Sequence, residues 1–326
     1  MSLQKKDVES KRNTDSARIA EALGVHSLDH FALSVPNLLQ AQRFYASFGL
    51  DVREEGAGLA LYTHGHPHRW AVLLESRAKQ LRYLSFGIFA QDVERLKQHI
   101  EACGTPLLEP PRELRGDGLW LRDPDGLWVE LRTAEKTSPN TKSVPEFRSS
   151  PPGQPGAPKR SQAPAVRPSR LGHCLMFTRS VPTAVSFYER VLGLRLSDHA
   201  GDDIAFMHGI HGSDHHLVAF ARAEGPGLHH CSWDVNSLNN LGLGAEQMAR
   251  QGYSAGWGVG RHVLGSNYFH YVRDPWGSHC EYSCDMDYIP AGDSWQARNH
   301  DGEDAFYVWG PKPPADWTHN YEADLH

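Results

Sequence analysis

The stretch LGHCLMFTRSVPTAVSFYERVLGL, residues 171–194, joins a strand pattern to a helix pattern and decides the expected fold. Apolar residues alternate around a central histidine as in a β-strand, and a helix with a Phe-Tyr pair follows and ends at Gly-Leu. The stretch LDHFALSVPNLLQAQRFYASFGL, residues 28–50, has the same layout. In both, the histidine precedes the Phe of the pair by 14 residues, as His30 precedes Phe44 and His173 precedes Phe187. The chain therefore contains an internal repeat.

The repeat continues beyond these two stretches. LRYLSFGI, residues 81–88, corresponds to LHHCSWDV, residues 228–235, and each is followed by a second helix pattern. An Asp-Pro-x-Gly turn then leads into a last strand, which carries Glu130 in one copy and Glu281 in the other. This order predicts an α+β fold with two domains, each of paired βαβββ modules whose mixed sheets curve into a funnel.

The composition along the chain predicts the domain boundaries. Residues 137–170 are rich in Pro, Ser and basic residues and lack the large apolar groups of a core, which indicates a linker. It separates an N-terminal domain, residues 26–136, from a C-terminal domain, residues 171–290. We expect residues 1–25 to be a flexible N-terminus and residues 291–326 to be an aromatic-rich tail.

Charge and hydropathy exclude several classes of partner. The net charge of −6 gives no basic stripe, so we expect neither nucleic acid nor an anionic membrane as a partner. No apolar run approaches a membrane span, and the polar start of the chain does not resemble a signal peptide. The five cysteines form no CxxC pair and are odd in number. These features predict a cytoplasmic protein with reduced thiols.

Three potential metal ligands lie on three separate predicted strands of the C-terminal domain: His173, His230 and Glu281. Two neutral imidazoles and one carboxylate form the facial triad of non-haem Fe(II) sites, which leaves the opposite face of the ion open. Neighbouring strand residues point to opposite sides of a sheet, so only one of His229 and His230 is expected to face the metal. His229 is the alternative if the strand phase differs by one residue.

The N-terminal domain provides an internal comparison for this metal site. Aligning LRYLSF with LHHCSW places Tyr83 opposite His230, whereas His30 and Glu130 correspond to the other two ligands. A domain without the middle ligand is expected to hold no metal.

The chain resembles the type I extradiol ring-cleaving dioxygenases of the vicinal oxygen chelate superfamily, in particular the metapyrocatechase-like catechol 2,3-dioxygenases. The resemblance spans about residues 26 to 290 and is carried by GRHVLGSNYFHYVRDPWGSHCE, residues 260–281. This segment matches the family signature from Gly-x-His through Tyr and Asp-Pro-x-Gly to the ligand glutamate. His270 departs from the pattern, because an apolar residue usually precedes the Tyr.

The resemblance implies roles for further residues and a reaction. His216 in DHHLVAF is similar to the family's acid–base histidine, and His215 is the alternative if the phase is wrong. His262 and Tyr271 resemble the pair that hydrogen-bonds the bound catecholate. The implied cofactor is Fe(II), or alternatively Mn(II), with O2 as co-substrate and a small-molecule catechol as substrate. The implied activity is extradiol ring cleavage in the breakdown of aromatic compounds.

Two other functions share this fold class. A glyoxalase-type isomerase or lyase would take its metal ligands across a shared site, and Tyr83 argues against that arrangement. A metal-free binding protein would not need His216, His262 and Tyr271 besides the three ligands. The fold alone does not separate these functions.

The tail is the remaining part of the chain that could cover a site. We expect it to fold over its own C-terminal domain or over a neighbouring subunit and to bury its aromatic residues, which include Trp295, Tyr307, Trp309 and Trp317. A homo-oligomer, a tetramer or otherwise a dimer, is expected.

Overall fold

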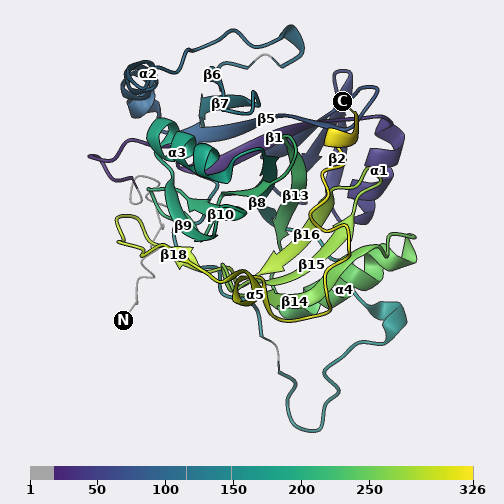
Figure 1. The fold of residues 1–326 in the computed structure, drawn as a ribbon. Helices are drawn as coiled ribbons and strands as arrows, with labels where there is room; N and C mark the ends of the chain where they lie inside the picture. The colour runs from purple at the N-terminus through teal and green to yellow at the C-terminus, as the bar shows by residue number, and fades with distance from the viewer. Residues whose placement is uncertain (1–17, 115, 148, 326) are drawn as a thin grey trace, which may run out of the picture.

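The first repeat folds into a seven-stranded mixed sheet in the computed structural model, which describes residues 18–114, 116–147 and 149–325 (Figure 1). Its elements are β1 (Ser27–Val35), α1 (Leu38–Ser47), β2 (Asp51–Glu55), β3 (Gly58–Tyr62), β4 (Arg69–Glu75), β5 (Gln80–Ile88), α2 (Val93–Ala102), β6 (Leu119–Arg122) and β7 (Trp128–Thr133). The strand order is β2-β3-β4-β1-β5-β7-β6. The first module is the expected βαβββ unit. In the second module only two strands follow the helix among the described residues, because the segment before β6 contains a 3₁₀ turn, Arg112–Leu114, instead of a strand.

The second repeat contains both βαβββ modules in full. They are β8 (Arg170–Thr178), α3 (Val181–Leu192), β9 (Arg195–Ala200), β10 (Ile204–His208) and β12 (Val218–Arg222), followed by β13 (Gly227–Asp234), α4 (Leu238–Arg250), β14 (Gly256–His262), β15 (Tyr268–Arg273) and β16 (His279–Cys284). The tail adds β18 (Arg298–Asn299), α5 (Gly302–Ala305) and β19 (Tyr307–Trp309). The sheet order is β18-β9-β10-β12-β8-β13-β16-β15-β14-β19, and β11 (Ser213–Asp214) pairs with β17 (Tyr288–Ile289) apart from it. The predicted fold class is confirmed.

Local sequence explains where these elements begin and end. The side chain of Ser180 caps α3 by accepting a hydrogen bond from the Thr183 amide, and Gly193 ends the helix with a φ of 72° that favours glycine. Before β16, Asp274 Oδ1 accepts hydrogen bonds from the amides of Trp276 and Ser278. This turn sets the position at which β16 starts and therefore the position of Glu281.

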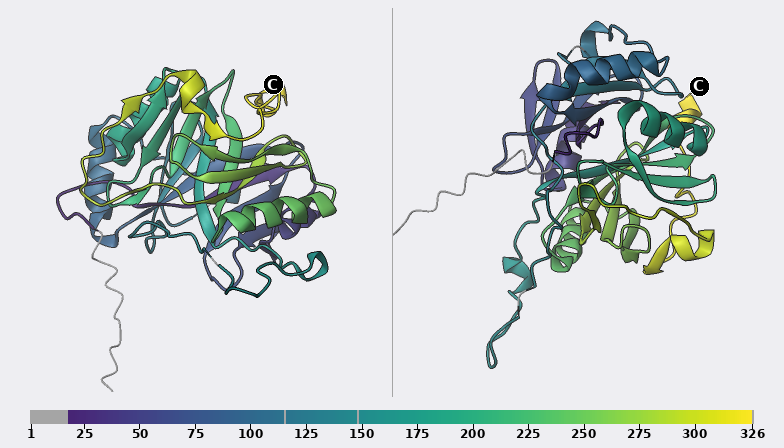
Figure 2. Two further views of the ribbon diagram at one scale, coloured as in Figure 1. Left: turned by 90° about the horizontal axis from the view of Figure 1, so that it is seen from below. Right: turned by 90° about the vertical axis from the view of Figure 1, so that its left-hand side faces the viewer.

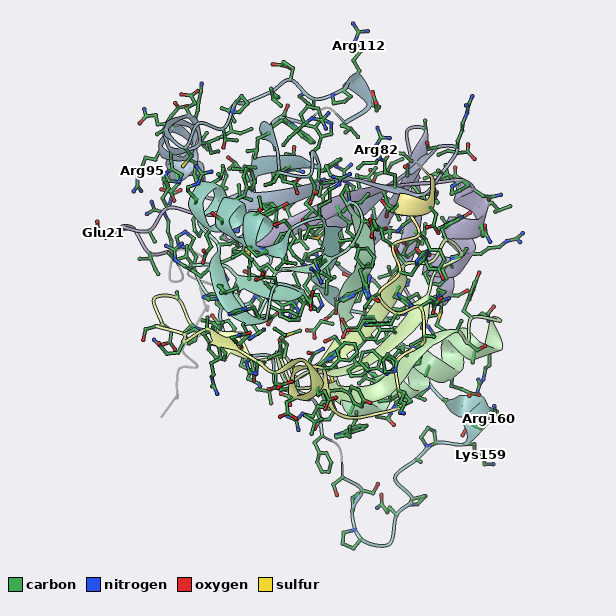
Figure 3. All side chains as sticks on the ribbon, in the orientation of Figure 1. Glu21, Arg82, Arg95, Arg112, Lys159 and Arg160 are labelled. Atoms are coloured by element: carbon green, nitrogen blue, oxygen red, sulfur yellow. The ribbon has the colours of Figure 1, made fainter. Side chains whose placement is uncertain are left out.

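The segments outside the two sheets run over their surfaces. The connection between β7 and β8 projects as a long loop away from both sheets (Figures 1 and 2). Beyond the tip of this loop the chain turns back, and Arg160 lies beside α4 and pairs with Glu246 (Figure 3). Residues 1–17 of the predicted flexible N-terminus lie outside the described residues, and Arg18 pairs with Asp92, the residue that precedes α2. None of the helices in the described part of the chain is long and apolar enough to cross a membrane.

The two sheets share one hydrophobic core. Phe48 at the end of α1 stacks on Tyr282 of β16 with ring centroids 3.8 Å apart, and the Tyr282 hydroxyl donates to the Phe48 carbonyl. The C-terminal tail pairs with β14 through β19 and continues to Glu322, which accepts a hydrogen bond from the Leu81 amide of β5 in the first sheet. The tail thus contacts both halves of the chain.

Candidate metal centre

Three neighbouring strands in the middle of the second sheet bring His173, His230 and Glu281 together. Ser232 of β13 lies opposite His173 on one side and Glu281 on the other, so the three side chains start from adjacent positions. Nε2 of His173 lies 3.2 Å from Nε2 of His230 and 3.2 Å from Oε2 of Glu281, and the third separation is 3.8 Å. All three residues are buried.

The electrostatics of these residues fit a bound cation. Asn267 donates a hydrogen bond to Oε1 of Glu281 at 3.1 Å, whereas the buried Oε2 has no hydrogen-bond partner among the described residues. Burial raises the pKa of Glu281, but His173 and His262 outweigh it and leave that pKa below its ordinary value. Burial and the neighbouring imidazoles hold the pKa of His230 well below its ordinary value, so its ring is neutral. Separations of roughly 3 Å are those of adjacent donor atoms on one ion with bonds of about 2.1 Å.

Within the described residues, these three side chains are the only such group of histidine, cysteine and carboxylate ligands whose donor atoms converge. In the first sheet the registers place Tyr83 opposite Trp128 and Ser85 opposite Glu130, as His230 lies opposite His279 and Ser232 opposite Glu281. Tyr83 therefore occupies the position equivalent to His230. Its hydroxyl lies 2.9 Å from Nε2 of His30.

His216 lies beside the cluster, in the loop just before β12. Its ring packs on His173 with centroids 4.1 Å apart, and its Nδ1 lies 3.0 Å from Nδ1 of His215. Nε2 of His215 in turn lies 3.0 Å from Oδ2 of Asp198 on β9. A carboxylate only accepts hydrogen bonds, so His215 donates from Nε2. In a neutral His215 ring, Nδ1 then accepts a hydrogen bond from Nδ1 of His216. Nε2 of His216 is therefore the nitrogen that has no bond to His215.

His262 and Tyr271 form a hydrogen-bonded pair on β14 and β15. Nε2 of His262 lies 2.9 Å from the Tyr271 hydroxyl and 4.0 Å from Oε1 of Glu281. Nδ1 of His262 donates to the carbonyl of Phe306 in the tail at 2.9 Å. Burial lowers the pKa of His262, and burial together with the Glu281 carboxylate raises the pKa of Tyr271.

The predicted opposite orientation of His229 and His230 is wrong. Leu228 pairs with Met176 and His230 with Leu175, so His229 is an extra residue in β13, a β-bulge. The bulge interrupts the alternation, and both rings line the same cavity with their Nδ1 atoms 2.7 Å apart. His270 lies on β15 next to Tyr271, and its side chain packs beside Gly258, with Nδ1 buried and without a partner among the described residues.

A cavity of about 770 Å³ opens in front of these residues. His173, His216, His230, His262 and Tyr271 line its polar end. Its apolar walls include Leu175, Ile204, Phe206 and Leu264, and the tail contributes residues from Asn299 to Gly302, Ala305, Phe306 and Trp317.

The structure adds contacts that sequence reasoning missed. Asn267 orients the carboxylate of Glu281, and its place between His262 and Tyr271 in the signature was the available signal. The contact of His262 with the Phe306 carbonyl could not be predicted, because every residue has a backbone carbonyl. Trp317 is buried as predicted, but Trp309 is exposed because β19 is the last strand of its sheet.

The comparisons with known proteins give the family of the chain. Residues 27–131 and 170–282 match the model of the Glyoxalase/Bleomycin resistance protein/Dioxygenase superfamily, and the chain belongs to this superfamily. Within it, the chain is 47% identical to metapyrocatechase 2 of Cupriavidus necator over 323 residues, which cover 99% of this chain and 100% of that one.

Solved structures show the same fold at lower identity. An extradiol ring-cleaving dioxygenase from B. fuscum has a TM-score of 0.72 at 21% identity and covers 92% of this chain and 83% of its own. A Mn(II)-bound glyoxalase from Novosphingobium aromaticivorans has a TM-score of 0.72 at 23% identity, with 89% and 93% covered. The fold thus serves more than one chemistry, and the family together with the His-His-Glu cluster implies a metal.

Proposed function

We propose that this protein is an extradiol dioxygenase that cleaves a catechol-type aromatic diol with O2, in the breakdown of aromatic compounds. His173, His230 and Glu281 would hold the metal. The proposal rests on one observation: these three buried side chains converge at the polar end of a cavity, and Oε2 of Glu281 has no hydrogen-bond partner in the described part of the chain. The 47% identity to a metapyrocatechase over nearly the whole chain supports it.

Fe(II) is the proposed ion, with Mn(II) as the alternative, and it would supply a redox-active centre with open coordination positions for the diol and O2. Two imidazoles and one carboxylate suit either ion. The three protein ligands come from β8, β13 and β16, so they occupy one side of the site and leave the cavity side for the reactants.

His216 is proposed to move the protons of the reaction. With Nδ1 engaged by His215, its Nε2 can accept a proton from a diol hydroxyl and later return it to an oxygen of the reacting group. Burial and His173 hold the pKa of His216 well below its ordinary value, so the resting ring is neutral and Nε2 has a free lone pair. His215 and Asp198 would keep the ring in this orientation.

His262 and Tyr271 are proposed to bind the diol oxygens. Because His262 donates from Nδ1 to Phe306, its Nε2 is an acceptor in the neutral ring, and the Tyr271 hydroxyl is a donor. This acceptor and this donor can exchange their mutual hydrogen bond for bonds to one protonated and one ionised oxygen of a diol. The apolar walls would hold the aromatic ring and exclude water.

The volume of the cavity bears on the range of substrates. About 770 Å³ exceeds the volume of a single aromatic ring, so substituted or two-ring diols are proposed to fit as well as catechol. A panel of such diols, followed by the absorbance of the yellow ring-cleaved product, tests the proposal. Metal-stripped protein should be inactive and should recover with ascorbate and ferrous salt, and full activity without metal would refute the proposal.

We further propose a cytoplasmic homo-oligomer, most simply a tetramer or a dimer. The location is supported by the five cysteines, which are all free thiols. Association is supported by the exposed Val308 and Trp309 on β19, an edge strand that could meet a second copy. Light scattering measures the mass directly, and a monomer would refute the oligomer.

A further inference from the structure

His229 connects the C-terminal tail to the metal centre through two hydrogen bonds. Its Nε2 lies 2.9 Å from the backbone carbonyl of Trp317, and its Nδ1 lies 2.7 Å from Nδ1 of His230. A carbonyl only accepts, so the proton of the neutral His229 ring is on Nε2. Nδ1 of His229 is then an acceptor, and the proton between the two rings belongs to His230. Nε2 of His230, which faces His173 and Glu281, is left with a free lone pair.

The carbonyl of Trp317 is held in place from both sides. The Trp317 indole is buried against His229, Tyr271 and Trp257, with ring centroids 4.6, 4.8 and 4.8 Å away. Five residues later, Glu322 is buried and anchors the tail to both sheets.

The anchor uses both oxygens of the carboxylate. One oxygen of Glu322 lies 2.6 Å from Nζ of Lys79 and accepts from the Leu228 amide at 2.9 Å, and the other accepts from the Leu81 amide at 2.9 Å. Leu228 directly precedes His229 in β13. The tail carbonyl, the bulge and the ligand strand therefore form one connected unit.

We propose that His229 is a positioning residue, which the Trp317 carbonyl orients and which fixes His230 in the tautomer that presents Nε2 to the metal. This inference rests on the proposed role of His230 as a metal ligand. Partners of this kind on ligand histidines typically contribute 10- to 100-fold to metal affinity. A second backbone carbonyl of the tail orients His262, because the Phe306 carbonyl accepts a hydrogen bond from Nδ1 of that ring.

His279 provides a matched control in the same cluster. It is buried beside Trp317, with ring centroids 4.8 Å apart, but neither of its ring nitrogens has a hydrogen-bond partner among the described residues. Replacing it by leucine removes a buried imidazole next to the tail without removing a hydrogen bond.

Two amide substitutions separate the two hydrogen bonds of His229. Asparagine at position 229 places an acceptor near the position of Nδ1, so it can still accept from His230, but it loses the hydrogen bond to the Trp317 carbonyl. Glutamine reaches the position of Nε2 and can still donate to that carbonyl, but it has no acceptor for His230. The measurement is the loss of Fe(II) from each loaded, full-length protein to an excess of chelator, without oxygen. We expect His229→Gln to bind Fe(II) about 10- to 100-fold more weakly than the wild type. His229→Asn and His279→Leu should stay close to the wild type.

The outcomes distinguish this inference from the proposed function. Wild-type protein that binds no Fe(II) would refute the metal centre itself. Wild-type binding with equal affinities for the glutamine and asparagine variants, or no loss in the glutamine variant, would overturn the role of His229 alone. A measurement without substitutions is nitrogen-15 NMR of zinc-loaded, histidine-labelled wild-type protein. It should show His229 protonated at Nε2 and bare at Nδ1, and the opposite tautomer would overturn the inference.

Discussion

The hydroxyl of Tyr83 lies 2.9 Å from Nε2 of His30, the nitrogen whose counterpart in the second repeat, Nε2 of His173, lies 3.2 Å from both His230 and Glu281. The phenol of Tyr83 fills the space that the second imidazole takes in the other repeat. Its hydroxyl also forms a hydrogen bond with Nε2 of His30, so this nitrogen is not free to bind a metal. We therefore predict about one metal ion per chain. Metal analysis of His230→Ala should show its loss, whereas the matched variant His30→Ala should keep it. Equal losses in the two variants would contradict a single site.

His216 should matter for turnover more than for binding. His216→Phe removes the only nitrogen proposed to carry protons, and we expect turnover to fall by about 10²- to 10⁴-fold. Metal content and diol affinity should remain, because the ring is not a ligand. Steady-state kinetics and metal analysis check this together, and unchanged turnover would transfer the role to His215.

The ion pair of Lys79 and Glu322 should be important for stability. Both side chains are buried, and removal of one partner leaves the other charged and unpaired, which typically costs about 3–5 kcal/mol. Glu322→Ala should lower the free energy of unfolding in urea by that order. The control is Lys142→Ala, whose exposed pair with Asp285 should contribute no more than about 1 kcal/mol. Similar effects of the two variants would contradict the anchoring of the tail.

Stability should fall as the solution is acidified through a defined window. Burial lowers the pKa of His26, His208 and His270 from 6.5 to about 4, with smaller contributions from neighbouring charges at the first two. Between these values the unfolded chain binds protons that the folded chain does not. The stability that these histidines contribute is therefore fully present above pH 6.5 and is lost progressively toward pH 4.

Urea unfolding at a series of pH values checks this slope. Each proton contributes about 1.4 kcal/mol per pH unit. His270→Leu should reduce the slope by about one proton. A wild-type stability that stays flat from pH 7 to pH 5 would refute the prediction.

Sequence reasoning succeeded where residue type carries the information. The paired His-to-Phe spacing led to the repeat and the fold class, and the signature of residues 260–281 led to the family. The fold class and the family are confirmed. Sequence reasoning also led to three side chains that the structure brings within a few ångströms of one another. Histidine and glutamate on predicted buried strands stand out in a sequence because a buried polar group needs a partner.

The remainder depends on features that residue type does not encode. The bulge at His229 inserts one residue into β13, and strict alternation has no signal for where such an insertion occurs. The carbonyls of Phe306 and Trp317 belong to the backbone, so any residue there could provide them. Trp309 was expected to be buried as an aromatic residue, but the single chain places it on an edge strand.

The most direct test of the proposed function is the stoichiometry and position of ring cleavage. Fe(II)-loaded protein is mixed with a catechol, O2 uptake is recorded with an electrode, and the product is identified by mass spectrometry and absorbance. We predict one O2 consumed per diol and a yellow semialdehyde-type product, opened beside the two hydroxyls. A colourless diacid opened between the hydroxyls, or an altered diol without O2 uptake, would contradict it.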